Sequence, residues 1–134
     1  MSQTYNILTR LERQGYIEGT IQVQEKRPDK RELRLTASGL ERFETWLGEL
    51  SACSVRAIRV EFTTRLYFLH ARNPASAVQA INRQATALGK SLARLRTDLE
   101  ATPSDQVFNR LGLSLRISQL ETLVSWLELS KESL

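Results

Sequence analysis

The most restrictive feature of the sequence is a heptad seam between residues 78 and 99. Seven apolar residues recur there at spacings of 3, 4, 3, 4, 3 and 4, the repeat of a helix that packs against another helix. These residues are Val78, Ile81, Ala85, Leu88, Leu92, Leu95 and Leu99. A helix with such a stripe needs a second apolar surface to cover it.

A second seam follows the first and has the same repeat, at spacings of 4, 3, 4 and 3. Its members are Leu113, Ile117, Leu120, Val124 and Leu127. Asn73-Pro74 and Thr102-Pro103-Ser104 interrupt the apolar pattern, so it predicts helices over 55–71, over 74–100 and from Ser104 to about Ser130. We interpret both seams as the interface of a homodimer, and packing within one chain is the alternative.

Residues 1–50 have a different pattern of apolar and polar residues. Apolar residues at Tyr5, Leu8 and Leu11 predict a helix over 2–14, and Gly15 stands where a helix-ending glycine belongs. Alternation over 20–24 and again over 33–35 predicts two strands joined by a charged turn. Thr36 is a suitable cap for a further helix.

Polar and basic side chains on this segment are of the kinds that contact DNA. The start of the first helix offers hydrogen-bonding groups to base edges. The turn carries Lys26, Arg27, Lys30, Arg31 and Arg34 against Asp29 and Glu32, a local net charge of +3. Such a tip suits phosphate contacts, and a merely solvated turn is the alternative.

These stretches resemble the PadR family of phenolic-acid-responsive repressors. The run from Ser2 to Ile17 (SQTYNILTRLERQGYI) looks like its recognition helix, and Arg27-Pro28 with LRLTASG over 33–39 looks like its wing. Leu33 replaces the usual aromatic residue. The tail resembles the helical C-terminal domain of longer PadR-like and virulence-activator-like regulators. Family members have two further helices and a short strand before the recognition helix, so the resemblance implies a winged helix without its first third.

The resemblance implies a fold that is mainly α with a small β-hairpin: a partial winged helix-turn-helix followed by a coiled-coil-like dimerisation domain. The first part is expected over 1–50 and the second over 51–134. Tyr5 falls where the family has a tyrosine near DNA, although its spacing also suits a core. The residues expected at DNA are Ser2, Gln3, Thr4, Tyr5, Asn6, Arg10, Lys26, Arg27, Lys30 and Arg31.

The function implied is that of a homodimeric transcription regulator, a repressor on double-stranded operator DNA that a small effector releases. The alternative is a module that pairs with a full-length regulator, or senses the effector, without binding DNA. Five aromatic residues are expected mainly in the core and are also candidates to line a pocket for a small aromatic effector. They are Trp46, Phe62, Tyr67, Phe68 and Trp126.

Composition limits the other classes of function. The net charge is +4, but residues 1–50 hold eight basic and eight acidic groups, so global charge says little about DNA. One histidine, His70, and one cysteine, Cys53, leave no spacing typical of a metal site and few groups for acid–base chemistry. We therefore expect no enzyme, no cofactor and no metal. A polar N-terminus and the lack of a long apolar run predict a cytoplasmic location without membrane contact.

Overall fold

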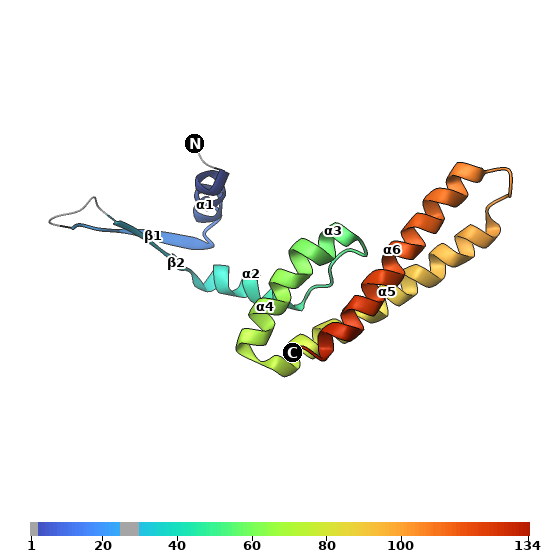
Figure 1. Ribbon diagram of the computed structural model, residues 1–134. Helices are drawn as coiled ribbons and strands as arrows, with labels where there is room; N and C mark the ends of the chain where they lie inside the picture. Colours follow the sequence, from blue (N-terminus) through green and yellow to red (C-terminus); the bar gives the residue numbers. More distant parts are fainter. Residues whose placement is uncertain (1–2, 25–29) are drawn as a thin grey trace. The chain divides into compact units, whose positions relative to one another are not determined.

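The computed structural model describes residues 3–24 and 30–134, which form two compact units, Met1–Gly48 and Glu49–Leu134 (Figure 1). Unit 1 contains α1 (Gln3–Arg13), β1 (Ile17–Gln22), β2 (Lys30–Leu35) and α2 (Ala37–Gly48). Unit 2 contains α3 (Val55–Ala57), a π-helical turn η1 (Ile58–Phe62), α4 (Thr63–Arg72), α5 (Pro74–Ala101) and α6 (Val107–Lys131). The predicted class, mainly helical with one small hairpin, is confirmed.

The end of α1 follows from its glycine. Gly15 has φ of 75°, a left-handed conformation that glycine adopts without steric cost. Its N–H donates to the carbonyl of Glu12 at 2.9 Å, and the N–H of Tyr16 donates to the carbonyl of Leu11 at 3.0 Å. This pair of bonds is the Schellman arrangement, which satisfies the last carbonyls of a helix. The predicted stop is confirmed.

The two strands pair antiparallel, from Ile17 opposite Leu35 to Gln22 opposite Lys30. The predicted strand boundaries were wrong at both strands, because pairing begins at Ile17 rather than Thr20 and β2 begins at Lys30 rather than Leu33. Strict alternation marked only the middle of the ladder. Ladder bonds also form where charged residues interrupt the pattern.

Thr36 joins the hairpin to α2, and its predicted role as a cap is confirmed. Its Oγ1 accepts the N–H of Gly39 at 3.0 Å, and its hydroxyl donates to the carbonyl of Gly15 at 2.6 Å. Gly39 is required by packing, since a Cβ at this position would lie 1.9 Å from the carbonyl oxygen of Tyr16. The capped start of α2 therefore lies directly against the chain that follows α1.

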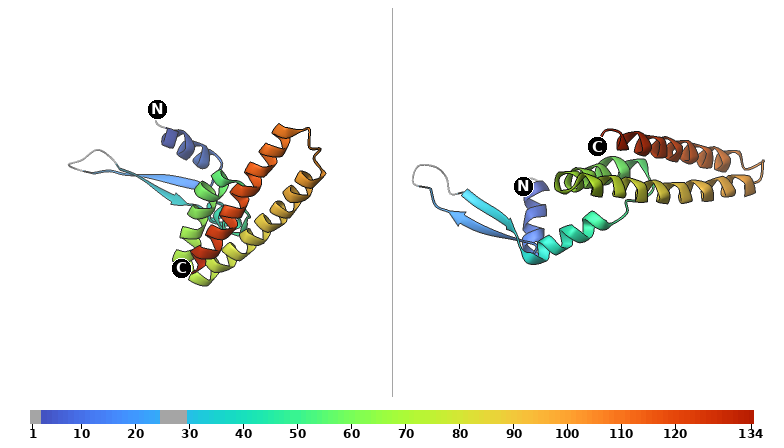
Figure 2. Two further views of the ribbon diagram at one scale, coloured as in Figure 1. Left: turned by 45° about the vertical axis from the view of Figure 1, so that its right-hand side comes forward. Right: turned by 90° about the horizontal axis from the view of Figure 1, so that it is seen from below.

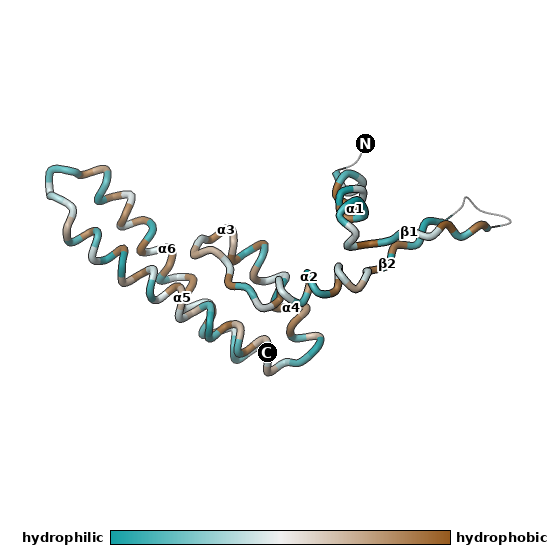
Figure 3. The backbone as a smooth tube through the Cα atoms, turned by 180° about the vertical axis from the view of Figure 1, so that it is seen from behind, coloured by the Kyte–Doolittle hydropathy of each residue, from teal (hydrophilic) through white to brown (hydrophobic). Residues whose placement is uncertain are grey.

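Unit 2 is built around α5 and α6, which lie side by side and run in opposite directions (Figure 2). Asn73 caps α5 through Oδ1, which accepts the N–H of Ala75 at 3.0 Å, and Pro74 occupies the first turn. The N-terminal helices of this unit pack on the pair, with Ile58, Phe62 and Leu66 in the same apolar core. Hydrophobic and hydrophilic stretches alternate along both long helices (Figure 3).

The predicted helix over 55–71 is interrupted by the π-helical turn. There the N–H of Thr63 donates to the carbonyl of Ile58, five residues earlier. A π turn shifts the register of a helix by one residue, and the spacing of apolar residues alone did not reveal it. Within residues 3–24 and 30–134, no helix is both long enough and apolar enough to cross a membrane.

Candidate functional site

One face of α1 forms a polar stripe made of Gln3, Asn6, Arg10 and Arg13. Their spacings of 3, 4 and 3 place them on one side of the helix, and all four are exposed. Within the described residues neither arginine makes an ion pair. The stripe thus begins with hydrogen-bonding groups, and it ends with two arginines that form no ion pair within the described residues.

Three of the residues expected at DNA belong to this stripe, and two do not. Thr4 shares the helix face of Leu8 and Leu11 by its spacing. Tyr5 lies on a third side and is 68% exposed, so it is not part of a core. Sequence reasoning missed Arg13, although its position three residues after Arg10 was a usable signal.

Arg31 of β2 is tied to α1. Its Nη2 donates to both carboxylate oxygens of Glu12 at 2.6 Å. The side chain passes over Gly19, where an added Cβ would lie 2.6 Å from the arginine Nε. We expected Arg31 to contact DNA, and the structure shows it in an exposed ion pair with Glu12 that joins the hairpin to α1.

The remaining cations of the hairpin differ in whether they form ion pairs. Arg34 donates to Glu32 on the same strand at 3.2 Å. Lys30 is exposed at the start of β2 and makes no ion pair among the residues that the structure describes. Ser2, Lys26 and Arg27, which were also expected at DNA, lie outside the described residues. Lys30 is therefore the described cation that the hairpin can offer to a phosphate.

Unit 1 also contains an apolar hollow of about 260 Å³. Its lining residues are Leu11, Tyr16, Ile17, Leu35, Gly39, Arg42, Phe43 and Trp46. The rings of Phe43 and Trp46 are stacked with centroids 5.8 Å apart. Of the aromatic residues considered for an effector pocket, only Trp46 lines this hollow.

The other aromatic candidates lie in unit 2 and are not gathered into one site. Phe62 is part of the core, whereas Tyr67 is 70% exposed. The rings of Tyr67 and Phe68 meet edge to face with centroids 5.3 Å apart. Phe68 and Trp126 remain partly exposed.

The two heptad seams face each other within one chain. Eleven of their twelve residues are in the core of unit 2 or packed against it: Ile81, Ala85, Leu88, Leu92, Leu95, Leu99, Leu113, Ile117, Leu120, Val124 and Leu127. The twelfth, Val78, is half-buried. Ile81, Leu88 and Leu127 have no exposed surface and so have none to offer a second chain in this arrangement. The seams thus make the intrachain contact that we weighed as the alternative.

A buried polar cluster fixes the first residues of unit 2. Gln84 of α5 accepts the N–H of Ser51 at 2.9 Å and donates to its carbonyl at 3.0 Å. Arg65, which is fully buried, donates to the hydroxyl of Ser51 at 2.9 Å and to Glu61 at 3.1 Å. Both backbone groups of Ser51 and its side chain are therefore held by the helical unit.

The solved structures that are similar to the chain include the following three. Bacillus subtilis PadR in complex with operator DNA is 23% identical, with a TM-score of 0.48 over 98% of this chain and 77% of that one. For smu.1604c from Streptococcus mutans UA159 the values are 22%, 0.44, 96% and 76%. For the PadR-like transcriptional regulator BC1756 from Bacillus cereus they are 23%, 0.48, 97% and 73%.

A family comparison covers most of unit 2. Among curated proteins, none matches the chain. Residues 58–134 match the family described as virulence activator alpha, C-terminal. The match takes in η1, α4, α5 and α6, and so the whole α5–α6 pair with most of the helices packed on it. Because it extends over more than half of the 134 residues, the chain belongs to the virulence activator alpha C-terminal family.

Proposed function

We propose that the chain is a DNA-binding transcription regulator that acts as a homodimer. The observation that carries this proposal is the exposed polar stripe of α1, on a helix that the Arg31–Glu12 contact fixes to a basic hairpin. The chain belongs to a family that takes its name from a virulence activator, and this supports a regulatory role.

The order of side-chain types along α1 suits DNA recognition. Gln3 and Asn6 at its start carry amides, which can pair with the edge of adenine in the major groove. Arg10 and Arg13 at its end suit phosphates, which fix the register of a protein on the duplex. Lys30 adds a cation from the hairpin, the element that a winged helix lays along the backbone.

Two finer points belong to the same proposal: the protein represses by occupying its operator, and a small aromatic effector releases it. The apolar hollow of unit 1 supports the second point, because Phe43 and Trp46 offer ring faces to a planar ligand. A phenolic acid is the probe for this step. Quenching of Trp46 fluorescence together with loss of DNA binding would support release, whereas undisturbed DNA binding at saturating acid would exclude it.

The alternative, a module that pairs with a regulator but does not bind DNA, is favoured by one observation. None of the residues of α1 is buried, and Ile7 is 42% exposed, so the described residues hold this helix by few contacts. Measured binding of duplex DNA by the chain distinguishes the two functions.

The test is a selection of bound duplexes from a randomised 30-base-pair library with the full chain. We expect enrichment of an inverted repeat whose half-sites are about 10 base pairs apart, since two-fold symmetric proteins read one helical turn per step. The matched control carries Arg10→Gln and Arg13→Gln and should enrich the same repeat more weakly, because it loses phosphate contacts but keeps Gln3 and Asn6. No enrichment by the unchanged protein would overturn the proposal and favour the alternative.

A further inference from the structure

Helix α6 has a second apolar stripe, on the side away from α5. Its large members are exposed, Trp126 the least of them: Phe108 86%, Leu111 59%, Leu115 61%, Trp126 39% and Leu129 64%. A residue on an α-helix is rotated about 100° from the one before it, which puts this stripe on the face opposite Leu113, Ile117 and Leu120 of the seam. A helix that is apolar on two opposite faces is normally covered on both.

The stripe has no charged residue between its two ends. Thr122 continues it in the middle, and Ser118 and Gln119 fill the space between Leu115 and Thr122. An apolar stripe that is exposed over about six turns and lacks charges is expected at an interaction surface. Charged neighbours such as Arg116 lie outside it by their position on the helix.

On the basis of the homodimer proposed above, we infer that this stripe, defined by Phe108, Leu111, Leu115, Thr122, Trp126 and Leu129, docks on the same stripe of a second copy. The two α6 helices run antiparallel. This is an isologous contact, in which one surface serves both chains and closes the assembly as a dimer.

The order of residues along the stripe suits an antiparallel two-fold axis at Ser118 and Gln119. About that axis Phe108 faces Leu129 of the second copy, and Leu111 faces Trp126. Leu115 faces Thr122 in the same way. Each aromatic ring thus meets an aliphatic side chain, and small polar residues meet in the centre, which favours interdigitated packing. Antiparallel helices also oppose their macrodipoles favourably.

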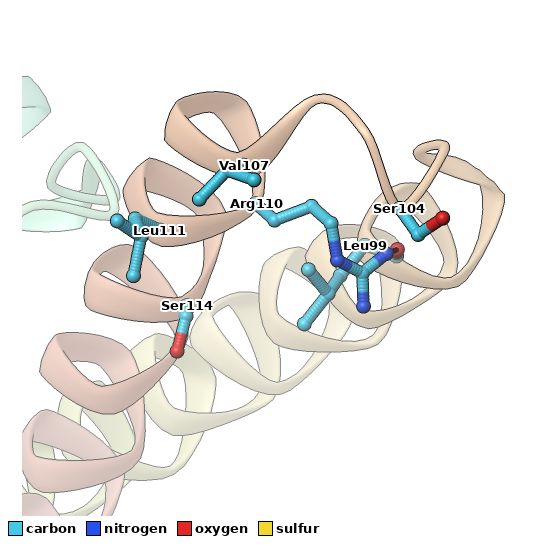
Figure 4. A pocket seen from close by; sticks show the side chains of 6 residues that line it. All are labelled: Leu99, Ser104, Val107, Arg110, Leu111 and Ser114. Carbon is cyan, nitrogen blue, oxygen red and sulfur yellow. Dashed lines mark hydrogen bonds between the residues drawn. The ribbon is translucent and has the colours of Figure 1, made fainter.

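A hollow beside Leu111 provides space for the largest side chain of the stripe. It has a volume of about 340 Å³ and is lined by Leu99, Ser104, Val107, Arg110, Leu111 and Ser114 (Figure 4). Arg110 reaches from α6 to the end of α5, where Nη1 donates to the carbonyls of Leu99 and Thr102 at 2.9 and 2.6 Å. In the inferred register Trp126 of the second copy faces this hollow.

The area involved is sufficient for a stable contact. If each of the five large side chains buries roughly 100 to 150 Å², two facing stripes remove on the order of 1,000 Å² or more from water, which is the size expected of a biological interface. An interface of this kind lies entirely within unit 2.

Disulfide trapping tests the register directly. In a Cys53→Ser background, one preparation carries Leu115→Cys and another Thr122→Cys. Mild oxidation should cross-link a mixture of the two chains and leave each preparation alone uncross-linked. Cross-linking of Leu115→Cys with itself would indicate a parallel pair and overturn the inference, as would the absence of any cross-link in the mixture.

Sedimentation without DNA tests the surface itself. Phe108→Ser should raise the dimer dissociation constant at least tenfold, because a large ring is lost from each end of the contact. The matched control is Tyr67→Ser, at an aromatic residue that is 70% exposed on α4 and should leave the constant unchanged. An unchanged dissociation constant for Phe108→Ser, or an equal rise for Tyr67→Ser, would overturn the inference. A stripe-dependent dimer that binds no duplex would reject the proposed function and keep this interface.

Discussion

The guanidinium of Arg31 donates to both carboxylate oxygens of Glu12 across the gap that Gly19 leaves. The two residues are 19 positions apart, so the bond is a tertiary contact between hairpin and α1. It orients the hairpin relative to the polar stripe. Arg31 therefore acts in our proposal as a positioning residue rather than as a phosphate ligand.

Glu12→Gln distinguishes two effects of Glu12 on DNA binding: its role in positioning the hairpin and the repulsion between its charge and the phosphates. If charge alone mattered, removal of a carboxylate near DNA would strengthen binding. We expect affinity for the selected duplex to fall by roughly 2- to 5-fold, the effect of losing an exposed ion pair. Fluorescence anisotropy at fixed salt measures it, with Glu18→Gln as the control because Glu18 is exposed on β1. A gain in affinity for Glu12→Gln would contradict the positioning role.

Gly19→Ala is expected to act through the same contact. The new Cβ would lie 2.6 Å from the Nε of Arg31, which forces the side chain off its path to Glu12. Its effect on affinity should therefore overlap with that of Glu12→Gln in a double-mutant cycle. Full additivity of the two changes would show that Gly19 does not serve the Arg31–Glu12 contact.

The sequence predicts features whose causes are local. Gly15 predicts the end of α1 and Thr36 predicts the start of α2, because each residue acts on the helical turn next to it. The Arg31–Glu12 bond and the Gln84–Ser51 bonds were not predictable, because the sequence carries no signal for which distant polar groups meet. The heptad seams show the remaining difficulty. Periodicity identifies a face that needs a partner but not whether that partner lies in the same chain.

Gly39→Ala should destabilise unit 1. Its Cβ would lie 1.9 Å from the backbone oxygen of Tyr16, which cannot move without disturbing the hairpin. We expect a loss of about 2 kcal/mol or more in the free energy of unfolding. In a Trp126→Phe background, Trp46 fluorescence in urea reports on unit 1 alone. The control is Gly48→Ala in the same helix, where a Cβ would meet nothing within 4 Å. Equal effects of the two substitutions would contradict this account.

Gln84→Ala should loosen the start of unit 2. It leaves the buried N–H and carbonyl of Ser51 without the partners they have at 2.9 and 3.0 Å, at a cost of about 2 kcal/mol or more. Hydrogen exchange of the Ser51 amide should accelerate at least tenfold. Gln79→Ala, at an exposed position of α5, should leave that rate unchanged. Unaltered exchange in the Gln84→Ala protein would rule out the anchoring role.

The salt dependence of duplex binding tests the central claim most directly. If Arg10 and Arg13 of both copies of the homodimer each neutralise one phosphate, Arg10→Gln with Arg13→Gln should make the slope of log K against log salt shallower by about 3.6, since each of the four contacts contributes roughly 0.9. Arg116→Gln, at an exposed arginine of α6, should leave the slope as it is. A slope that does not change in the α1 variant would contradict the assignment of α1 as the DNA-binding helix.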